Sequence, residues 1–306
     1  MHERMFYTRR VRAAYREEPC RTALNRVRGM PFEWSLNPYM GCAHRCSFCY
    51  VRAFEQRADR PSGSAYGSSI RVKVNIVEVL ARELARRSWR GAGVAIGAAT
   101  DPYQPAEGRY RLTRGCLESL AAAANPFAVI TRSPLIVRDL DLLVACARRA
   151  DVGVAISIAT LDADLARRIE PTVAPPAQRL RAVAALAQAG VRVGVAVAPV
   201  LPDLTDDVDS LRGVVRAAAD AGAQHVWHNA LNLGEVTRDA YFAFLEDARP
   251  DLVARYARLF RSGRYAESAY VHLVAERMRA ARTGVRFAPQ RALAPDRTGE
   301  QLSLGC

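Results

Sequence analysis

Residues 37–50 read NPYMGCAHRCSFCY and contain three cysteines, Cys42, Cys46 and Cys49, at the spacing C-x3-C-x2-C. A proline and a glycine precede the cysteines and predict a loop at this place. Three thiolates on so short a loop can converge on one soft metal centre. A four-iron cluster normally takes four thiolates, so three ligands from this loop would leave one iron open to a small molecule.

Two other interpretations of the loop stay open. Zinc could be held by the three cysteines and His44, because Cys3His is a common structural zinc site. Structural zinc sites usually bring a second ligand pair from a distant segment, however, and the sequence shows no such pair. Three buried cysteines without a metal are the remaining alternative, although three of the seven cysteines fall within eight residues. The pattern therefore favours an iron–sulfur cluster.

The loop resembles the radical S-adenosylmethionine (SAM) superfamily, whose motif C-x3-C-x-aromatic-C has Phe48 in its aromatic position here. The longer run from Asn37 to Tyr50 is similar to the spore-photoproduct-lyase-like branch of that superfamily. The resemblance implies a 4Fe-4S cluster whose open iron chelates the amino and carboxylate groups of SAM. It implies that one electron then cleaves SAM to methionine and a 5′-deoxyadenosyl radical, which abstracts a substrate hydrogen atom. An external electron donor of the flavodoxin or ferredoxin type is implied as a partner.

Composition limits the class of protein. Half of the 306 residues are hydrophobic, which is enough for a large buried core. No signal peptide and no run of membrane-spanning length is found, so we expect a cytoplasmic protein with no membrane partner. The formal charge is +13, but Lys73 is the only lysine among 44 basic residues, a bias that a GC-rich genome also explains. Nucleic acid is therefore a candidate partner that charge alone does not establish, and the oligomeric state is not indicated.

Strand-like and helix-like segments alternate through most of the chain. Continuous apolar strands separated by amphipathic helices are typical of an α/β protein whose parallel sheet is covered on both faces. The pattern allows a doubly wound open sheet or a barrel, and the family resemblance implies a partial six-unit (β/α) TIM-type barrel. Either arrangement places the site at the carboxyl ends of the strands, where the cysteine loop follows the first strand. The predicted strands are 32–36, 93–99, 127–131, 152–158, 191–200 and 225–231.

We expect four regions along the chain. A basic N-terminal arm occupies 1–30, and the radical SAM partial barrel occupies 31–234. After residue 234 the β/α alternation stops, and apolar residues at helical spacing predict a helical extension at 235–284 that forms a C-terminal cap on the barrel. The remaining segment, 285–306, is rich in proline, glycine and polar residues and is predicted to be a disordered tail.

Further candidate site residues follow the predicted strands. Thr100 and Asp101 open the block TDPYQP after the second strand, and the resemblance implies that this segment helps to hold the SAM amino group. A rigid turn in which Asp101 caps nearby amides is the alternative. Ser157 lies in an apolar run and is a candidate for the SAM ribose or carboxylate, or a satisfied core serine. Arg179 could bind the SAM carboxylate bidentately, or could form a structural pair with Glu170.

The last candidates come from the end of the sixth strand and from the cysteine loop itself. Asn229 lies where the resemblance implies that adenine would bind. Tyr39 and Phe48 belong to the motif of the same branch and are further candidates for cofactor binding. Tyr50, which directly follows the third cysteine, is the candidate catalytic residue.

One comparison with the strict spore photoproduct lyases argues for a different substrate. In that family, tyrosines on both sides of the third cluster cysteine and a downstream cysteine help to return a hydrogen atom. This sequence has Phe48 on one side, which has no phenolic hydrogen, and no cysteine lies between Cys49 and Cys116. We therefore expect that the chain is not a strict spore photoproduct lyase and that SAM is consumed at each turnover. An iron–sulfur or zinc protein that binds nucleic acid or senses redox state without SAM chemistry is the alternative function.

Overall fold

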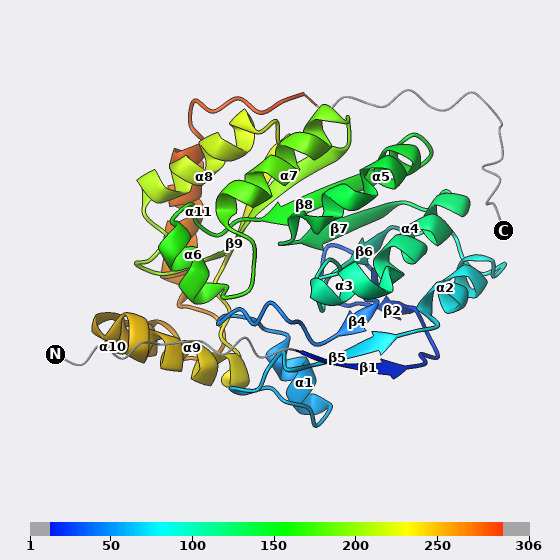
Figure 1. Ribbon diagram of the computed structural model, residues 1–306. Coiled ribbons are helices and arrows are strands. Elements are labelled where there is room, and N and C mark those ends of the chain that lie inside the picture. Colours follow the sequence, from blue (N-terminus) through cyan, green and yellow to red (C-terminus); the bar gives the residue numbers. More distant parts are fainter. Residues whose placement is uncertain (1–12, 290–306) are drawn as a thin grey trace.

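The computed structural model describes residues 13–289, and its centre is a seven-stranded, largely parallel sheet (Figure 1). Along this sheet the strand order is β10-β9-β8-β7-β6-β3-β2. Its strands are β2 (Leu24–Arg26), β3 (Trp34–Leu36), β6 (Val94–Ile96), β7 (Phe127–Thr131), β8 (Val152–Ser157), β9 (Arg192–Val200) and β10 (His225–Ala230). Six strands run parallel, and β2 is an antiparallel edge strand next to β3.

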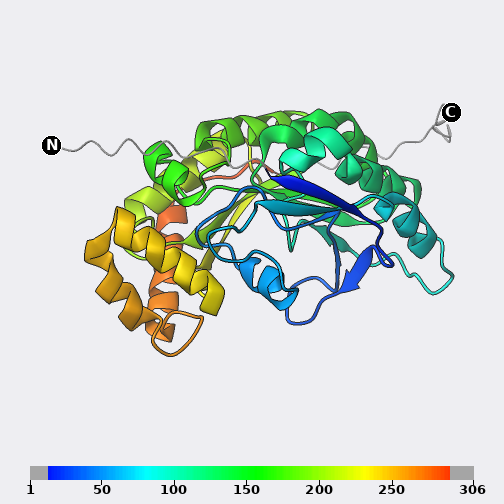
Figure 2. The same ribbon diagram turned by 60° about the horizontal axis from the view of Figure 1, so that its bottom comes forward.

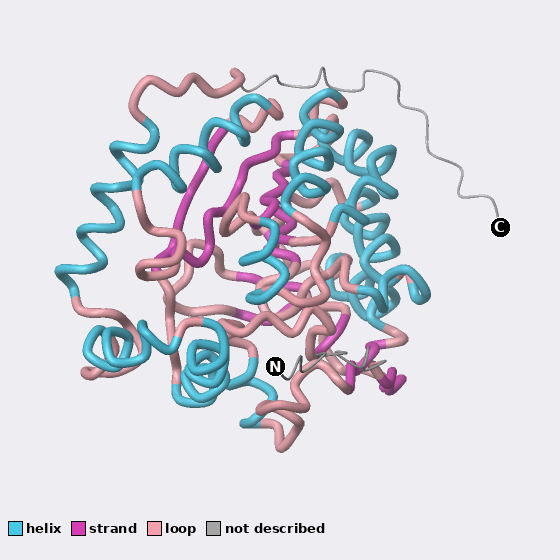
Figure 3. The backbone as a smooth tube through the Cα atoms, turned by 60° about the vertical axis from the view of Figure 1, so that its left-hand side comes forward, coloured by secondary structure: helices cyan, strands magenta, loops and turns pink. Residues whose placement is uncertain are grey.

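Helices cover the outer side of this sheet, so that the strands lie inside a layer of helices (Figure 3). They are α2 (Ile76–Leu84), α3 (Pro105–Tyr110), α4 (Leu112–Ala122), the 3-10 helix η1 (Pro134–Asp139), α5 (Leu140–Ala147), α6 (Ala163–Ile169), α7 (Pro176–Gln188) and α8 (Val208–Asp220). Helix α8 shows why such segments form helices. Its Asp207 cap accepts a hydrogen bond from the Ser210 amide at 2.8 Å, and its buried residues Leu211, Val215 and Ala218 recur at helical spacing.

The predicted fold class is confirmed, because six parallel strands alternate with helices in the order that the sequence indicated. The predicted strand at 127–131 has the observed bounds of β7. Pro134 opens a 3-10 helix in front of α5, and the Ser133 hydroxyl caps it by accepting from the Leu135 amide at 3.3 Å.

A second, three-stranded sheet was not predicted. It contains β1 (Ala14–Glu18), β5 (Ser69–Lys73) and β4 (Tyr39–Met40) in the order β1-β5-β4, and α1 (Arg52–Arg57) lies next to it (Figure 1). Strand β1 belongs to the predicted N-terminal arm, and most of its residues are exposed, so no hydrophobic period marks it. Because β4 leads directly into the cysteine loop, this sheet supports that loop.

The C-terminal helices are present as predicted. They are α9 (Glu235–Ala248), the 3-10 helix η2 (Pro250–Leu252), α10 (Val253–Leu259) and α11 (Ser268–Arg282). Helix α11 packs along α8, and α9 packs against α1 beside the cysteine loop (Figure 2). The predicted tail beyond residue 289 and the first 12 residues of the arm lie outside the described residues. No helix within 13–289 is long and apolar enough to cross a membrane.

Candidate metal and cofactor site

The cysteine loop begins where β4 ends, and its first turn requires a glycine. Gly41 has a φ of +77°, and a Cβ atom there would lie 2.9 Å from the Ser69 carbonyl oxygen. The Gly41 carbonyl accepts hydrogen bonds from the Thr100 hydroxyl at 2.6 Å and from the Gln104 amide at 3.1 Å. The segment that follows β6 therefore holds the cysteine loop, together with the three-stranded sheet.

Two of the three cysteines are buried. Cys42 and Cys46 are each 6% exposed, whereas Cys49 is half-buried. Burial raises the pKa of the Cys42 thiol, and it raises the pKa of the Cys46 thiol against the opposing effect of the Arg132 cation. Metal binding requires the thiolate form, which a nearby cation favours.

The cysteines are not gathered around a single ion. Within residues 13–289, no three His, Cys, Asp or Glu side chains are grouped closely enough to hold one metal ion. A structural zinc site needs four ligands around one ion, whereas the ligands of a four-iron cluster are spread around a larger body. The zinc alternative that the sequence left open would need Cys42, Cys46, Cys49 and His44 around one ion.

His44 lies between the first two cysteines and faces a small pocket. Its ring nitrogens are buried without a well-formed hydrogen bond among the described residues, and Nε2 lies 3.4 Å from Asp101 Oδ2. The pocket has a volume of about 540 Å³, and its lining also includes Tyr103, Ser133 and Thr172. It adjoins the cysteine loop on the side where the β6 and β7 units end.

Asp101 connects three segments at the ends of β6 and β7. One carboxylate oxygen accepts from the Tyr103 amide at 2.9 Å and from the Thr131 hydroxyl at 2.6 Å, and the other accepts from the Arg132 amide at 2.7 Å. Burial tends to raise the pKa of Asp101, but His44 and these donors outweigh it and hold the pKa below its usual value. Asp101 therefore caps nearby amides, and its role in holding the SAM amino group stays a prediction.

Thr100 and Gln104 are directed to the backbone of the cysteine loop. Besides its bond to Gly41, Gln104 accepts a hydrogen bond from the Ala43 amide at 3.0 Å, and it donates to the Thr100 hydroxyl at 2.8 Å. Gln104 is fully buried, so these bonds are shielded from water. The block TDPYQP thus holds the loop, a role that the sequence did not assign to Gln104.

Arg179 forms the structural pair that the sequence offered as an alternative. Its side chain is 1% exposed and pairs with Glu170, and it donates to the carbonyls of Ser157 at 2.9 Å and Ala174 at 2.8 Å. Its assignment to the SAM carboxylate stays a prediction beside this observed pair. Ser157 ends β8 and is 2% exposed, and Arg179 binds its backbone rather than its hydroxyl.

Arg132 was missed by the sequence reasoning and lies beside the cysteine loop. Its guanidinium donates to Glu170 at 2.8 Å and to the Ala198 carbonyl at 2.8 Å, and its Cζ atom lies 5.4 Å from the centroid of the Phe48 ring. Phe48 is 6% exposed and packs between the loop and this cation. A single arginine after a strand forms no motif, so its place beside the cysteine loop could not be predicted.

Tyr39 also has a structural role. It is fully buried, and its hydroxyl donates a hydrogen bond to Glu107 at 2.5 Å. Glu107 in turn accepts from the Thr113 amide at 2.8 Å and pairs with Arg138 at 2.7 Å. The assignment of Tyr39 to cofactor binding stays a prediction.

Tyr50 and Asn229 are exposed, in contrast to the buried candidates. Tyr50 is 48% exposed, and its hydroxyl donates to the carbonyl of Ala98 just beyond β6. Its ring meets the edge of Phe54 with 5.9 Å between the centroids. Asn229 is exposed near the end of β10. Both residues therefore lie where an added molecule could reach them.

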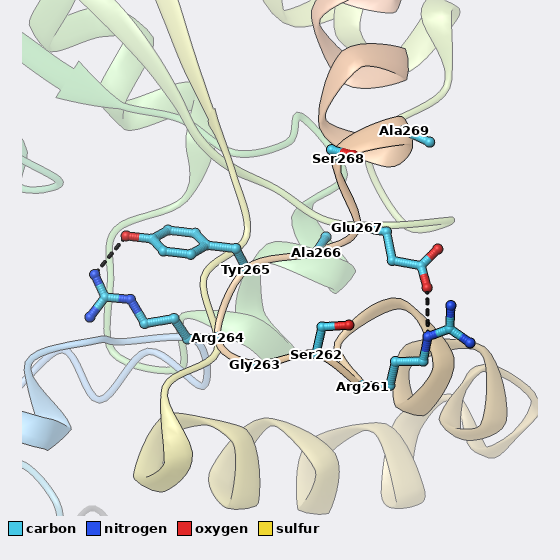
Figure 4. Close-up of a pocket in the computed structure, with 9 residues that line it drawn as sticks. All are labelled: Arg261, Ser262, Gly263, Arg264, Tyr265, Ala266, Glu267, Ser268 and Ala269. Carbon is cyan, nitrogen blue, oxygen red and sulfur yellow. Dashed lines mark hydrogen bonds and ion pairs between the residues drawn. The ribbon is translucent and has the colours of Figure 1, made fainter.

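A loop next to the end of β10 carries an exposed aromatic side chain and two arginines. Residues 261–269 connect α10 to α11 and line an open pocket of about 650 Å³ (Figure 4). Tyr265 is 59% exposed, and Arg264 lies over its ring, 4.8 Å from the centroid. The Leu233 amide donates to the Arg264 carbonyl at 2.8 Å and ties the loop to the segment that follows β10. Tyr50, Phe54 and Tyr265 are the aromatic residues among the strongly exposed large apolar side chains of the described chain.

Comparison with known families identifies the class of protein. The family described as the Radical SAM superfamily matches residues 36–212, a range that begins in β3 and ends in α8. Because this range covers more than half of the chain, the chain belongs to the radical SAM superfamily. Membership implies a 4Fe-4S cluster and SAM, and radical SAM enzymes generally need a reductant.

Two relatives show how far the similarity extends. An uncharacterized protein of Mycobacterium tuberculosis is 37% identical over 309 residues, which cover 98% of this chain and 91% of that protein. An uncharacterized protein of the Acidianus two-tailed virus is 32% identical over 211 residues, which cover 65% of this chain and 67% of the viral protein. The similarity to the mycobacterial protein therefore includes the C-terminal helices.

Solved structures of spore photoproduct lyase share the fold. The lyase complexed with dinucleoside spore photoproduct has a TM-score of 0.66 at 16% identity, over 90% of this chain and 81% of that chain. A mutant lyase with bound AdoMet and dinucleoside spore photoproduct has a TM-score of 0.65 at 18% identity, with the same coverage. At these identities the likeness concerns the fold alone, and it confirms the predicted fold.

Proposed function

We propose that this protein reductively cleaves SAM at a 4Fe-4S cluster held by Cys42, Cys46 and Cys49, and that it abstracts a hydrogen atom from a substrate. The observation that carries the proposal is the three-cysteine loop at the carboxyl end of the first of six parallel strands. Family membership supports the same cofactors. When bound, the cluster and SAM supply the one-electron chemistry that yields the 5′-deoxyadenosyl radical.

The protein's own residues would hold and shield this site. Thr100 and Gln104 hold the backbone of the cysteine loop through buried hydrogen bonds. Arg132 places a cation beside Cys46 and Phe48, where it favours the thiolate form of the ligand. Asn229 stays our proposed contact for adenine, and Ser157 our proposed contact for the ribose or carboxylate of SAM. Tyr50, exposed beside the third ligand, is the proposed catalytic residue.

A nucleic-acid component is our proposed class of substrate. The formal charge of +13 and the exposed aromatic residues beside the site support it. Bases stack on exposed aromatic rings, and arginines contact the phosphate backbone. Two of the exposed rings have an arginine over them, Arg57 on Phe54 and Arg264 on Tyr265. Because Phe48 replaces one of the relay tyrosines, we propose a substrate other than the spore photoproduct, with SAM consumed at each turnover.

The environment of the protein follows from its cofactor. Reduced thiolates that bind a cluster persist in a reducing compartment, which supports a location in the cytoplasm. A flavodoxin or ferredoxin is the proposed donor of the electron, because both supply single electrons to proteins in that compartment.

Product analysis tests the proposal. Protein reconstituted anaerobically with iron and sulfide, then reduced with dithionite, should convert SAM to methionine and 5′-deoxyadenosine even without substrate. The Cys49→Ala variant should form neither product. Brown wild-type protein that forms neither product would favour the alternative of a redox-sensing or nucleic-acid-binding iron–sulfur protein. Colourless protein with stoichiometric zinc would favour the zinc alternative.

A further inference from the structure

The sulfur of Cys49 has a hydrogen-bond partner from outside the cysteine loop. It lies 3.1 Å from the hydroxyl oxygen of Tyr66. Tyr66 is 1% exposed and belongs to the segment between α1 and β5, which carries no cysteine and no sequence motif. A buried phenol directed at the sulfur of a cluster ligand is thus a specific contact and not a surface accident.

The segment that carries Tyr66 is fixed against the cysteine loop. Gly67 has a φ of +75°, and a Cβ atom there would lie 2.5 Å from the Cys42 carbonyl oxygen, so the two backbones are in direct contact. Arg45 also donates to the Ser64 carbonyl of this segment at 2.9 Å. Only glycine permits so close an approach with this backbone conformation.

Arg52 lies over the ring of Tyr66. Its Cζ atom lies 4.4 Å from the ring centroid, and its guanidinium donates to the carbonyls of Ser62 at 2.9 Å and Gly63 at 2.7 Å. Arg52 is itself 6% exposed. A buried cation therefore lies against the phenol ring whose hydroxyl contacts Cys49.

We infer that Tyr66 is a positioning residue that donates a hydrogen bond to the Cys49 thiolate and raises the reduction potential of the cluster. This inference rests on the proposed function, because it requires the cluster. A thiolate ligand has no proton to donate, so the phenol must be the donor. Reduction adds negative charge to the cluster and its sulfurs, and a hydrogen bond to that charge is stronger in the reduced state. The Arg52 cation acts in the same direction.

The consequence concerns the delivery of the first electron. A cluster with a higher potential is reduced by a weaker donor, so this contact widens the range of donors that can serve the enzyme. Hydrogen bonds to cluster sulfurs and buried charges are among the means by which proteins set such potentials.

The test replaces Tyr66 without changing its packing. The Tyr66→Phe variant keeps the ring and its contact with Arg52 but loses the hydroxyl. We expect the reconstituted variant to bind iron like the wild type and its equilibrium constant for reduction to fall about tenfold, which is about 59 mV for one electron. A redox titration followed by electron paramagnetic resonance (EPR) measures the potential. The Tyr270→Phe variant, which removes another buried hydroxyl that bonds Asp206 at 2.9 Å, should leave the potential unchanged.

A second measurement keeps the inference testable if Tyr66→Phe loses its cluster. A ring-fluorinated tyrosine at position 66 has the same shape and a more acidic hydroxyl, so it is a stronger donor and should raise the potential. A residue that only packs would move the potential in neither substitution. Equal potentials in wild-type, fluorinated and Tyr66→Phe proteins would overturn the inference and leave the proposed function intact. Wild-type protein that assembles no cluster would instead refute the proposed function.

Discussion

Cys49 differs from the other two ligands in its surroundings. Cys42 and Cys46 are buried in the loop, whereas Cys49 is half-buried between the Tyr66 hydroxyl and the exposed Tyr50. The cysteine spacing predicts the three cysteines as ligands. The partners of their sulfurs could not be predicted, because Tyr66 lies 17 residues from Cys49 in a segment without hydrophobic period. Contacts of this kind depend on how two loops pack.

Removal of any one ligand should abolish the cluster. We expect Cys42→Ala, Cys46→Ala and Cys49→Ala proteins to keep almost no iron after reconstitution and to lack the visible absorption of a thiolate–iron centre. Cys20→Ala is the matched control, since Cys20 lies outside the loop and should not affect iron content. Iron and sulfide analysis measures the result. Full iron content in any of the three loop variants would contradict the ligand assignment.

Arg179 should be needed for stability rather than for SAM binding. Removal of one partner from a buried ion pair leaves an uncompensated charge, so Arg179→Met should lower the free energy of unfolding by about 3–5 kcal/mol. Arg249, which pairs with Asp251 at the surface, provides the control, and Arg249→Met should unfold almost like the wild type. Denaturant titration measures both. A stable Arg179→Met protein with weakened SAM binding would instead support the predicted role of Arg179 at the SAM carboxylate.

Glu170, the partner of Arg179, should make the stability of the protein depend on pH in the acid range. Burial tends to raise the pKa of Glu170, but Arg179 and Arg132 outweigh it and hold the pKa below its usual value. The stability from this carboxylate is therefore fully present above the unfolded pKa of about 4.3, and it is lost as the pH falls through the folded pKa. Glu170→Gln should be less stable at neutral pH and should lose less stability on acidification. If the free energy of unfolding of this variant fell below pH 4 as steeply as that of the wild type, the assignment of this pH dependence to Glu170 would be wrong.

At the scale of elements, the alternating strands and helices were predictable because each has a strong hydrophobic period. The small sheet was not, since most of β1 is exposed and β4 has only two residues. The TDPYQP block was predicted to help hold the SAM amino group. Its contacts with the cysteine loop were not predicted. Its side chains form hydrogen bonds with the backbone of the cysteine loop. Such a contact between two loops produces no sequence motif in either of them.

Gln104 should couple this block to the metal centre. Gln104→Ala leaves the Gly41 carbonyl and the Ala43 amide with fewer buried partners, so we expect a loss of about 1–3 kcal/mol in stability together with faster loss of iron. Asn75→Ala is the control, because Asn75 makes two hydrogen bonds to the Cys20 backbone, away from the loop. It should reduce stability while iron is lost at the wild-type rate. Equal rates of iron loss to a chelator in both variants would contradict the coupling.

At the scale of the whole molecule, the parallel sheet positions one rim where the cysteine loop, the exposed aromatic residues and the 261–269 loop meet the ends of the strands. The sequence indicated the fold class and the C-terminal helices, but not which helix would lie beside the site. Helix α9 packs against α1, and the Thr237 hydroxyl donates to the Cys49 carbonyl at 3.2 Å. The C-terminal helices therefore contribute to the site itself as well as covering the barrel.

If the rim binds nucleic acid, its aromatic residues should contribute to affinity. Tyr265→Ala should weaken binding of a single-stranded oligonucleotide by about 1–3 kcal/mol if one base stacks on the ring. Tyr110→Ala, in the α3 helix beside the small sheet, should have little effect. Binding should also weaken with salt as condensed counterions are released. Binding that heparin displaces completely, with no loss in Tyr265→Ala, would indicate non-specific attraction to arginine.

The central claim is that three thiolates from one loop hold a cluster with an iron open to SAM. EPR spectroscopy of the reduced, reconstituted protein tests it most directly, with SAM labelled by isotope at its amino nitrogen. We expect a cluster signal that changes when SAM is added and that shows coupling to the labelled nitrogen, because SAM would bind the open iron. A cluster signal that SAM leaves unchanged, or protein that carries zinc and gives no signal, would contradict it.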